Sequence, residues 1–119
     1  DDVPPRAVRE LLKAPAILGY STHNPEQVTQ AIQEPVSYVA IGPVFETRSK
    51  ANPDPVVGLQ GVRDAVARAG HLPVVAIGGI TLATAASVRE AGAASVAVIA
   101  DLLVGDPAAR AREYVGALR

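Results

Sequence analysis

The sequence contains no cysteine, few aromatic residues and no long apolar run. The absence of cysteine among 119 residues excludes disulfide bonds, a thiolate nucleophile and zinc sites built on cysteine. Aromatic residues make up 3% of the chain, so the hydrophobic content of 49% comes mainly from alanine, valine, isoleucine and leucine. This composition favours a small, closely packed α/β core. No apolar run reaches the roughly 18 residues that a membrane-spanning helix needs, so we expect no membrane partner.

The chain also lacks an excess of either charge. Eleven basic and twelve acidic residues give a formal net charge of -1, and without a basic stripe nucleic acid is a poor candidate partner. No signal peptide is visible, so we expect a cytoplasmic protein. The chain begins at Asp1 without a methionine, and we expect the native N-terminus to lie further upstream.

Strand-like runs alternate with helical patterns along the sequence. An opening helix is expected from Pro5, and Asn24 and Asp106 are good N-caps for two later helices. The apolar runs predict strands at 16–20, 37–42, 73–77 and 94–100. Strands that alternate with helices favour a parallel sheet, and no linker divides the chain. We therefore interpret residues 1–119 as one α/β segment.

One connection is unusually long for an α/β unit. It spans residues 41–58, IGPVFETRSKANPDPVVG, whereas such connections usually take about 2–6 residues and longer ones are commonly functional. Two hydroxyl and two cationic side chains follow one another in it: Thr47, Arg48, Ser49 and Lys50. This set suits a polyanionic phosphate group. A solvated polar loop is the alternative interpretation.

Other polar or glycine-rich segments follow the remaining strands. Ligands of parallel α/β folds bind where the strands end, and in barrels the loops after the last two strands frequently hold phosphate. The segments that would meet there, besides the long connection, are Ser21–His23, Gly78–Thr81 and Ala100–Val104. Paired glycines let the backbone approach a ligand closely. For the first segment, ordinary helix capping with an exposed His23 is the alternative.

Four stretches together resemble the thiamine-phosphate synthase family, which also includes the thiazole tautomerases. The stretches are ILGYSTHNPEQ (17–27), YVAIGPVFETRSK (38–50), PVVAIGGIT (73–81) and AGAASVAVIADLL (91–103). They occur in the family's order and at close to its spacing, and they match the C-terminal half of its barrel. The resemblance implies a C-terminal half-barrel segment of a (β/α)8 TIM-barrel domain, covering about strands five to eight.

The resemblance also implies an activity and the residues that support it. The enzyme would be a transferase of thiamine biosynthesis that couples a hydroxymethylpyrimidine pyrophosphate to a thiazole phosphate and releases pyrophosphate. The implied catalytic residues are Ser21 and Lys50. The implied substrate-binding residues are Thr47, Ser49 and Lys50 for the pyrophosphate, and Gly79, Val98, Ile99 and Ala100 for the thiazole phosphate. The implied cofactor is Mg²⁺, with Asp2 as a ligand.

One position departs from the family pattern, and another distinguishes its synthase branch from its tautomerase branch. Asp101 stands where the family commonly has alanine, and it would be an unfavourable charge beside a phosphate. Pro43 stands where tautomerase relatives carry a catalytic histidine, which favours the synthase over a tautomerase-like isomerase. Two further hypotheses are a non-catalytic phosphate-binding paralogue and an unrelated phosphate-binding barrel. The hydroxyl and cationic residues at 47–50 argue against both.

Four strands alone cannot close an eight-stranded barrel, and they would leave two unpaired strand edges. We hypothesise that another chain, a second copy in a homo-oligomer, or a missing N-terminal half-barrel completes the domain. That half would also supply the other magnesium ligand and much of the pyrimidine site.

Overall fold

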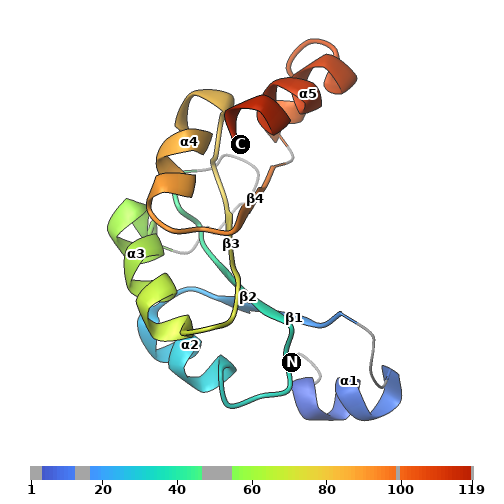
Figure 1. The fold of residues 1–119 in the computed structure, drawn as a ribbon, viewed down its shortest axis with the longest axis vertical. Coiled ribbons are helices and arrows are strands. Elements are labelled where there is room, and N and C mark those ends of the chain that lie inside the picture. The colour runs from blue at the N-terminus through green and yellow to red at the C-terminus, as the bar shows by residue number, and fades with distance from the viewer. Residues whose placement is uncertain (1–3, 13–16, 47–54, 99, 119) are drawn as a thin grey trace.

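The computed structural model describes residues 4–12, 17–46, 55–98 and 100–118, in which helices and strands alternate (Figure 1). In chain order they are α1 (Pro5–Leu12), β1 (Gly19–Thr22), α2 (Pro25–Ala31), β2 (Tyr38–Ile41), α3 (Gly58–Ala69), β3 (Val74–Ile77), α4 (Leu82–Glu90), β4 (Ser95–Ala97), the 3-10 helix η1 (Ala100–Leu103) and α5 (Pro107–Ala117). Of the helices in these ranges, none is long and apolar enough to cross a membrane.

The four strands form one parallel sheet in the order β1-β2-β3-β4. Their register aligns Ser21 with Ala40, Ala40 with Val75, and Val75 with Ser95. Because all four strands run in one direction, their C-terminal ends lie along one edge of the sheet. The predicted α/β fold with a parallel sheet is confirmed.

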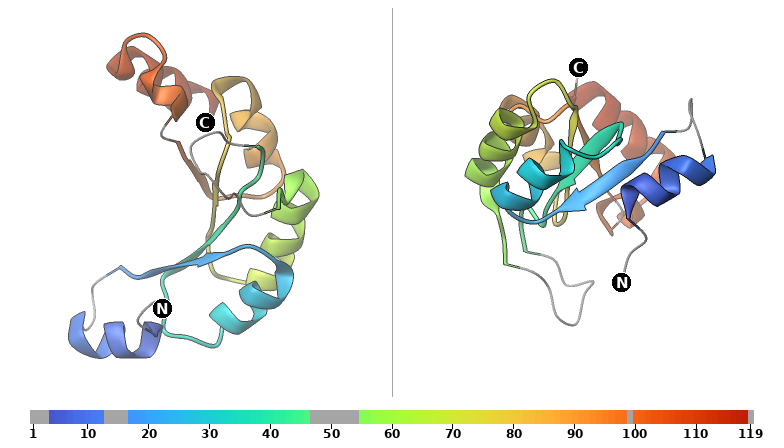
Figure 2. Two further views of the ribbon diagram at one scale, coloured as in Figure 1. Left: turned by 180° about the vertical axis from the view of Figure 1, so that it is seen from behind. Right: turned by 90° about the horizontal axis from the view of Figure 1, so that it is seen from below.

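The core lies on one face of this sheet. Helices α2, α3 and α4 pack along that face (Figures 1 and 2). They bury Val39, Ile41, Val74 and Ala76, each of which is at most 2% exposed. Side chains alternate between the two faces of a strand, so the neighbouring residues of β2 and β3 point the other way.

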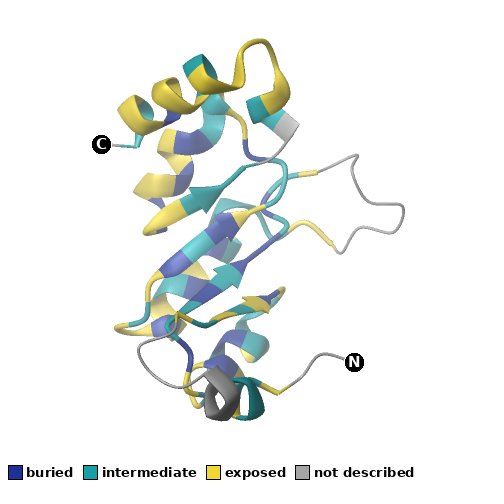
Figure 3. Ribbon diagram, turned by 90° about the vertical axis from the view of Figure 1, so that its right-hand side faces the viewer, coloured by how far each residue is buried: buried dark blue, intermediate teal, exposed yellow. Residues whose placement is uncertain are grey.

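The opposite face is much more open. Figure 3 views the sheet from this side, where the strands rather than α2–α4 face the viewer. Ala40 and Val75 are half-buried here, and Ile77 is 40% exposed. In a closed barrel this face would be the interior, because the helices of such barrels form the outer ring.

Two predicted helix starts are confirmed. The Asn24 side chain accepts a hydrogen bond from the Gln27 amide at 2.8 Å, and Pro25 begins α2. The Asp106 side chain accepts from the Ala108 amide at 3.4 Å at the start of α5. These side chains satisfy amides that the first turn of a helix leaves unpaired.

The first and fourth strands differ from the prediction by more than one residue at an end. The first strand was expected at 16–20, but β1 runs from Gly19 to Thr22 because those residues pair with Tyr38–Ile41. Ile17, in the apolar run that suggested the earlier start, is 79% exposed. The fourth strand was expected at 94–100, but β4 ends at Ala97. Backbone pairing, rather than the length of the apolar run, limits each strand.

Asp101 joins η1 to α4 and α5. Its side chain is 11% exposed. One carboxylate oxygen accepts from the Leu82 amide at 2.9 Å and from the Tyr114 hydroxyl, and the other accepts from Arg110 Nη2 at 3.1 Å. The bond from Tyr114 is the main cause that lowers the pKa of Asp101. Burial is the main cause that raises the pKa of Tyr114. The carboxylate that looked unfavourable in the sequence is thus balanced by a guanidinium and a helix N-terminus.

We predict that Asp101→Asn lowers the free energy of unfolding at neutral pH by about 1–2 kcal/mol, because it weakens charge-assisted hydrogen bonds. The folded-state pKa of Asp101 is lowered. Its carboxylate therefore stabilises the fold fully at pH values above the ordinary pKa of aspartate. This stabilisation is lost as the pH falls below about 4 and through the folded-state pKa. Urea unfolding at neutral and acidic pH measures this difference.

The matched control is Asp106→Asn, because asparagine caps a helix about as well as aspartate. This variant should unfold like the wild type at both pH values. An Asp101→Asn penalty that persisted unchanged under acidic conditions would contradict the assigned role of the carboxylate.

Candidate functional site

The start of the long connection packs against the end of β3. The Val44 amide donates to the Ile77 carbonyl at 3.0 Å, and the Phe45 amide donates to the Gly78 carbonyl at 3.1 Å. Residues 44 and 45 therefore bond to the last residue of β3 and to the glycine that follows it. This backbone pairing fixes where the long connection leaves the sheet.

The two ends of the long connection also meet. The Val57 amide donates to the Pro43 carbonyl at 2.8 Å, and the Gly58 amide donates to the Val44 carbonyl at 2.9 Å. The segment that returns to α3 is thus held against the segment that leaves β2. The connection has a backbone-bonded base at the C-terminal edge of the sheet, where the sequence predicted a phosphate site.

The glycine pair after β3 lies against this base. Gly78 and Gly79 have φ angles of +100° and +65°, a region that favours glycine. A Cβ on Gly79 would lie 2.7 Å from the Phe45 carbonyl oxygen and closer still to that of Glu46. Glycine at position 79 is therefore required by the neighbouring backbone as well as by the turn. The sequence indicated a close approach to a ligand but did not reveal this second reason.

The end of β4 is tied to the same region. Asp101, the second residue of η1, accepts from the Leu82 amide at 2.9 Å, three residues beyond Gly79. Val98 is half-buried directly after β4, and Ala100 begins η1. The predicted phosphate-binding residues Gly79, Val98 and Ala100 thus belong to two adjacent segments that a side chain holds together.

Ser21 lies on the open face of the sheet. It is the third residue of β1, aligned with Ala40 of β2, and it is exposed. The sequence placed Ser21 in the join after the strand, whereas the structure places it within β1 with its row of side chains facing away from α2–α4. That is the face that would line a barrel.

Several predicted site residues lie outside the described residues: Asp2, Thr47, Ser49, Lys50 and Ile99. Their roles stay predictions. Within the ranges that the structure describes, there is no group of three or more His, Asp or Glu side chains placed to hold a metal ion.

His23 is a residue whose role the sequence left open. It follows β1 directly and is exposed. Its Nδ1 donates to the Gly42 carbonyl at 2.7 Å, and its backbone amide donates to Gln27 Oε1 at 2.7 Å. A histidine directly after a strand, two residues from the predicted Ser21, was the signal available in the sequence.

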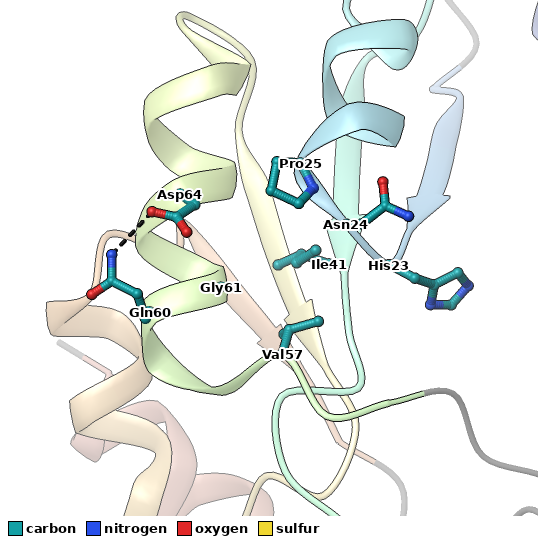
Figure 4. Close-up of a pocket in the computed structure, with 8 residues that line it drawn as sticks. All are labelled: His23, Asn24, Pro25, Ile41, Val57, Gln60, Gly61 and Asp64. Atoms are coloured by element: carbon teal, nitrogen blue, oxygen red, sulfur yellow. Dashed lines mark hydrogen bonds between the residues drawn. The ribbon is translucent and has the colours of Figure 1, made fainter.

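A separate cavity of about 260 Å³ lies between the first turns of α2 and α3 (Figure 4). Ile41 and Val57 line it together with Gln60, whose Nε2 donates to Asp64 Oδ1 at 3.0 Å. Figure 4 shows the His23 ring pointing away from Gln60 and Asp64. Because Ile41 faces the helices, this cavity lies on the other side of the sheet from Ser21.

Comparison with solved structures agrees with this fold. The solved structure of thiamine phosphate pyrophosphorylase from Pyrococcus furiosus superimposes with a TM-score of 0.86 and 28% identity, over 99% of this chain and 55% of that one. A 3-hexulose-6-phosphate synthase structure has a TM-score of 0.63 at 23% identity, covering 96% of this chain and 54% of that one. At that identity it shows a shared fold and no more.

Curated proteins of similar sequence include thiamine-phosphate synthases. The thiamine-phosphate synthase of Koribacter versatilis (strain Ellin345) is 54% identical over 115 residues, which cover 97% of this chain and 54% of the relative. That of Roseiflexus castenholzii (strain DSM 13941 / HLO8) is 44% identical, over 94% of this chain and 49% of the relative. The chain thus spans about half the length of these two curated relatives. The family model described as thiamine monophosphate synthase matches residues 1–102, and the chain belongs to that family.

Proposed function

We propose that this chain forms the C-terminal half of a thiamine-phosphate synthase. The enzyme would join a hydroxymethylpyrimidine pyrophosphate to a thiazole phosphate and release pyrophosphate. The observation that carries the proposal is the contact between the Gly78–Gly79 turn and residues 44–46 of the long connection. This contact puts the glycine turn, which is implied in binding thiazole phosphate, directly beside residues 44–46. Those residues lead to Thr47, Ser49 and Lys50, which are implied in binding pyrophosphate.

In this proposal the two phosphate-bearing substrates are held by different kinds of groups. Backbone amides at Gly79 and at 98–100 bind the thiazole phosphate, since exposed amides at a glycine turn suit an anion. Thr47, Ser49 and Lys50 bind the pyrophosphate, and Thr47 follows Glu46 directly in the chain. Close placement of the two substrates would lower the barrier by orienting the reacting atoms.

Ser21 and Lys50 carry the proposed catalytic roles. The pyrimidine methylene carbon loses pyrophosphate while carbocation character develops, so negative charge grows on the leaving oxygen. The Lys50 ammonium group stabilises that charge. Ser21 lies exposed on the open face of β1 and supplies a hydroxyl beside the reacting carbon. Pro43, at the tautomerase histidine position, favours this reaction over an isomerisation.

Mg²⁺ is the proposed cofactor, and Asp2 is the proposed ligand from this chain. A carboxylate oxygen is the type of ligand that Mg²⁺ prefers. When bound, the ion would neutralise charge on the pyrophosphate. We propose that the missing half of the barrel supplies the other magnesium ligand. A cytoplasmic location is part of the same proposal.

The open face and the two sheet edges support a second half of the barrel. In the described part of the chain, β1 and β4 each pair with one neighbouring strand. Ile77 is 40% exposed on the face that a barrel would enclose. We propose that the missing half covers both. This chain spans about half the length of the two relatives, and we propose an N-terminal segment of the same polypeptide as the source; a second chain or a second copy would serve the same purpose.

We predict that the native particle contains this 119-residue sequence together with a second half-barrel, on the same chain or on another. Native mass measurement combined with intact-chain mass spectrometry tests this. A soluble, well-folded monomer of the 119 residues alone would show that the half-barrel needs no partner, and it would count against the enzyme.

We predict that Lys50→Ala lowers kcat by about a hundredfold or more while the affinity for thiazole phosphate changes by less than about threefold. The reason is that the ammonium acts on charge that grows in the transition state. Steady-state kinetics and calorimetric titration measure the two quantities. Lys13→Ala, at the chain's other lysine, is the control. Equal losses in kcat and in the affinity for thiazole phosphate would show that Lys50 attracts anionic substrates in general and does not act on the transition state.

We predict that Gly79→Ala raises KM for thiazole phosphate at least about tenfold, because the new methyl group forces the 45–46 backbone away from the turn. The control is Gly105→Ala. Gly105 has a similar φ of +72°, but its Cβ position has no atom within 4 Å. This control carries the backbone strain of about 1–2 kcal/mol that alanine meets at a positive φ, without the collision. If both variants raised KM equally, the strain rather than the contact would be responsible.

A further inference from the structure

His23 connects the ends of β1 and β2. Its Nδ1 lies 2.7 Å from the Gly42 carbonyl oxygen. A carbonyl oxygen only accepts hydrogen bonds, so Nδ1 carries the hydrogen and donates it. The Gly42 amide, in turn, donates to the Thr22 carbonyl at 3.2 Å. Both backbone polar groups of Gly42 are therefore held by the residues that end and follow β1.

Gly42 begins the segment that packs against the glycine turn. Two residues on, the backbone bonds of Val44 and Phe45 to β3 and Gly78 begin, and the Glu46 carbonyl lies against Gly79. A continuous series of backbone contacts thus runs from the His23 ring to Gly79. A shift of the Gly42 carbonyl would be passed on to the glycine turn, because residues 42–46 have few free torsions once these bonds form.

We propose that His23 is a positioning residue for the phosphate-binding turn. Its hydrogen bond to Gly42 fixes the position of residues 42–46 relative to β3. In that position Phe45 and Glu46 contact Gly78 and Gly79 and determine the conformation of the turn. In this role His23 touches neither substrate. The inference rests on the proposed function, in which the turn binds the phosphate of thiazole phosphate.

Two substitutions separate this role from a general need for a side chain. In His23→Asn the amide nitrogen stands at the same distance from Cγ as Nδ1 and can donate to Gly42. In His23→Gln the amide nitrogen is one bond further out, nearer to the position of Nε2. Both variants keep a polar side chain of moderate size, so neither creates a large cavity.

The chain offers a matched control in its other histidine. His71 is exposed in the turn between α3 and β3, at the end of the sheet opposite to the strand ends that carry the site. His71→Ala therefore removes an imidazole without touching residues 42–46. His23→Ala completes the series.

The experiment uses the protein that carries this chain, with the rest of its barrel in place. Inorganic phosphate is titrated while the amide resonances of Gly78 and Gly79 are followed by NMR, and kcat and KM for thiazole phosphate are measured separately. We expect His23→Ala and His23→Gln to shift the Gly79 resonance in the unliganded protein. Both should weaken phosphate binding and raise KM about fivefold, the effect of one hydrogen bond, with kcat changed less than about twofold. His23→Asn and His71→Ala should match the wild type.

The possible outcomes distinguish a failure of the His23 positioning role from a failure of the proposed synthase function. If the wild type shows neither phosphate-induced shifts at Gly78 and Gly79 nor synthase turnover, the proposed function fails. If the wild type binds and turns over but His23→Gln behaves like His71→Ala, the positioning role fails and the function stands. Rescue by glutamine but not by asparagine would also overturn the role of Nδ1.

Discussion

The parallel register of four short strands is the constraint on which the rest of this structure depends. Each strand pairs over three or four residues, so few backbone bonds decide which side chains face the helices. A shift of one residue would move Val39 and Ile41 from the core to the open face. The same register brings the C-terminal ends of the strands together. Fold and site therefore have one origin.

Backbone contacts rather than side chains shape the described part of the candidate site. Residues 43–46 bond to β3, to the glycine turn and to the returning end of the long connection. At Gly79 there is no room for a side chain between the turn and the Phe45 carbonyl. In the proposed function, amides held by such a backbone would meet the phosphate in fixed positions, which costs little reorganisation when the ligand binds. It also means that a substitution at such a glycine acts through geometry rather than through lost chemistry.

Charged groups close to the site are used to hold its parts together. Asp101 connects η1 with the start of α4 and with Arg110 and Tyr114 of α5. Its side chain is largely buried, so its charge needs these partners. The packing of α5 against η1 and α4 therefore depends on a carboxylate that has no proposed contact with substrate. This explains how an acidic residue can occupy a position next to the proposed phosphate-binding segment.

The sequence by itself determined the order of helices and strands, the parallel sheet and the family, because these depend on periodic apolar residues, on caps such as Asn24 and on contiguous motifs. It also suggested roles for Gly79 and Ser21, and those roles stay predictions. Only the tertiary structure decided that β1 extends through Thr22, that Asp101 is balanced by Leu82, Arg110 and Tyr114, and that His23 bonds to Gly42. Each of these depends on residues distant in the sequence that meet once the strands pair, and no local pattern encodes which partner a strand end or a carboxylate will find.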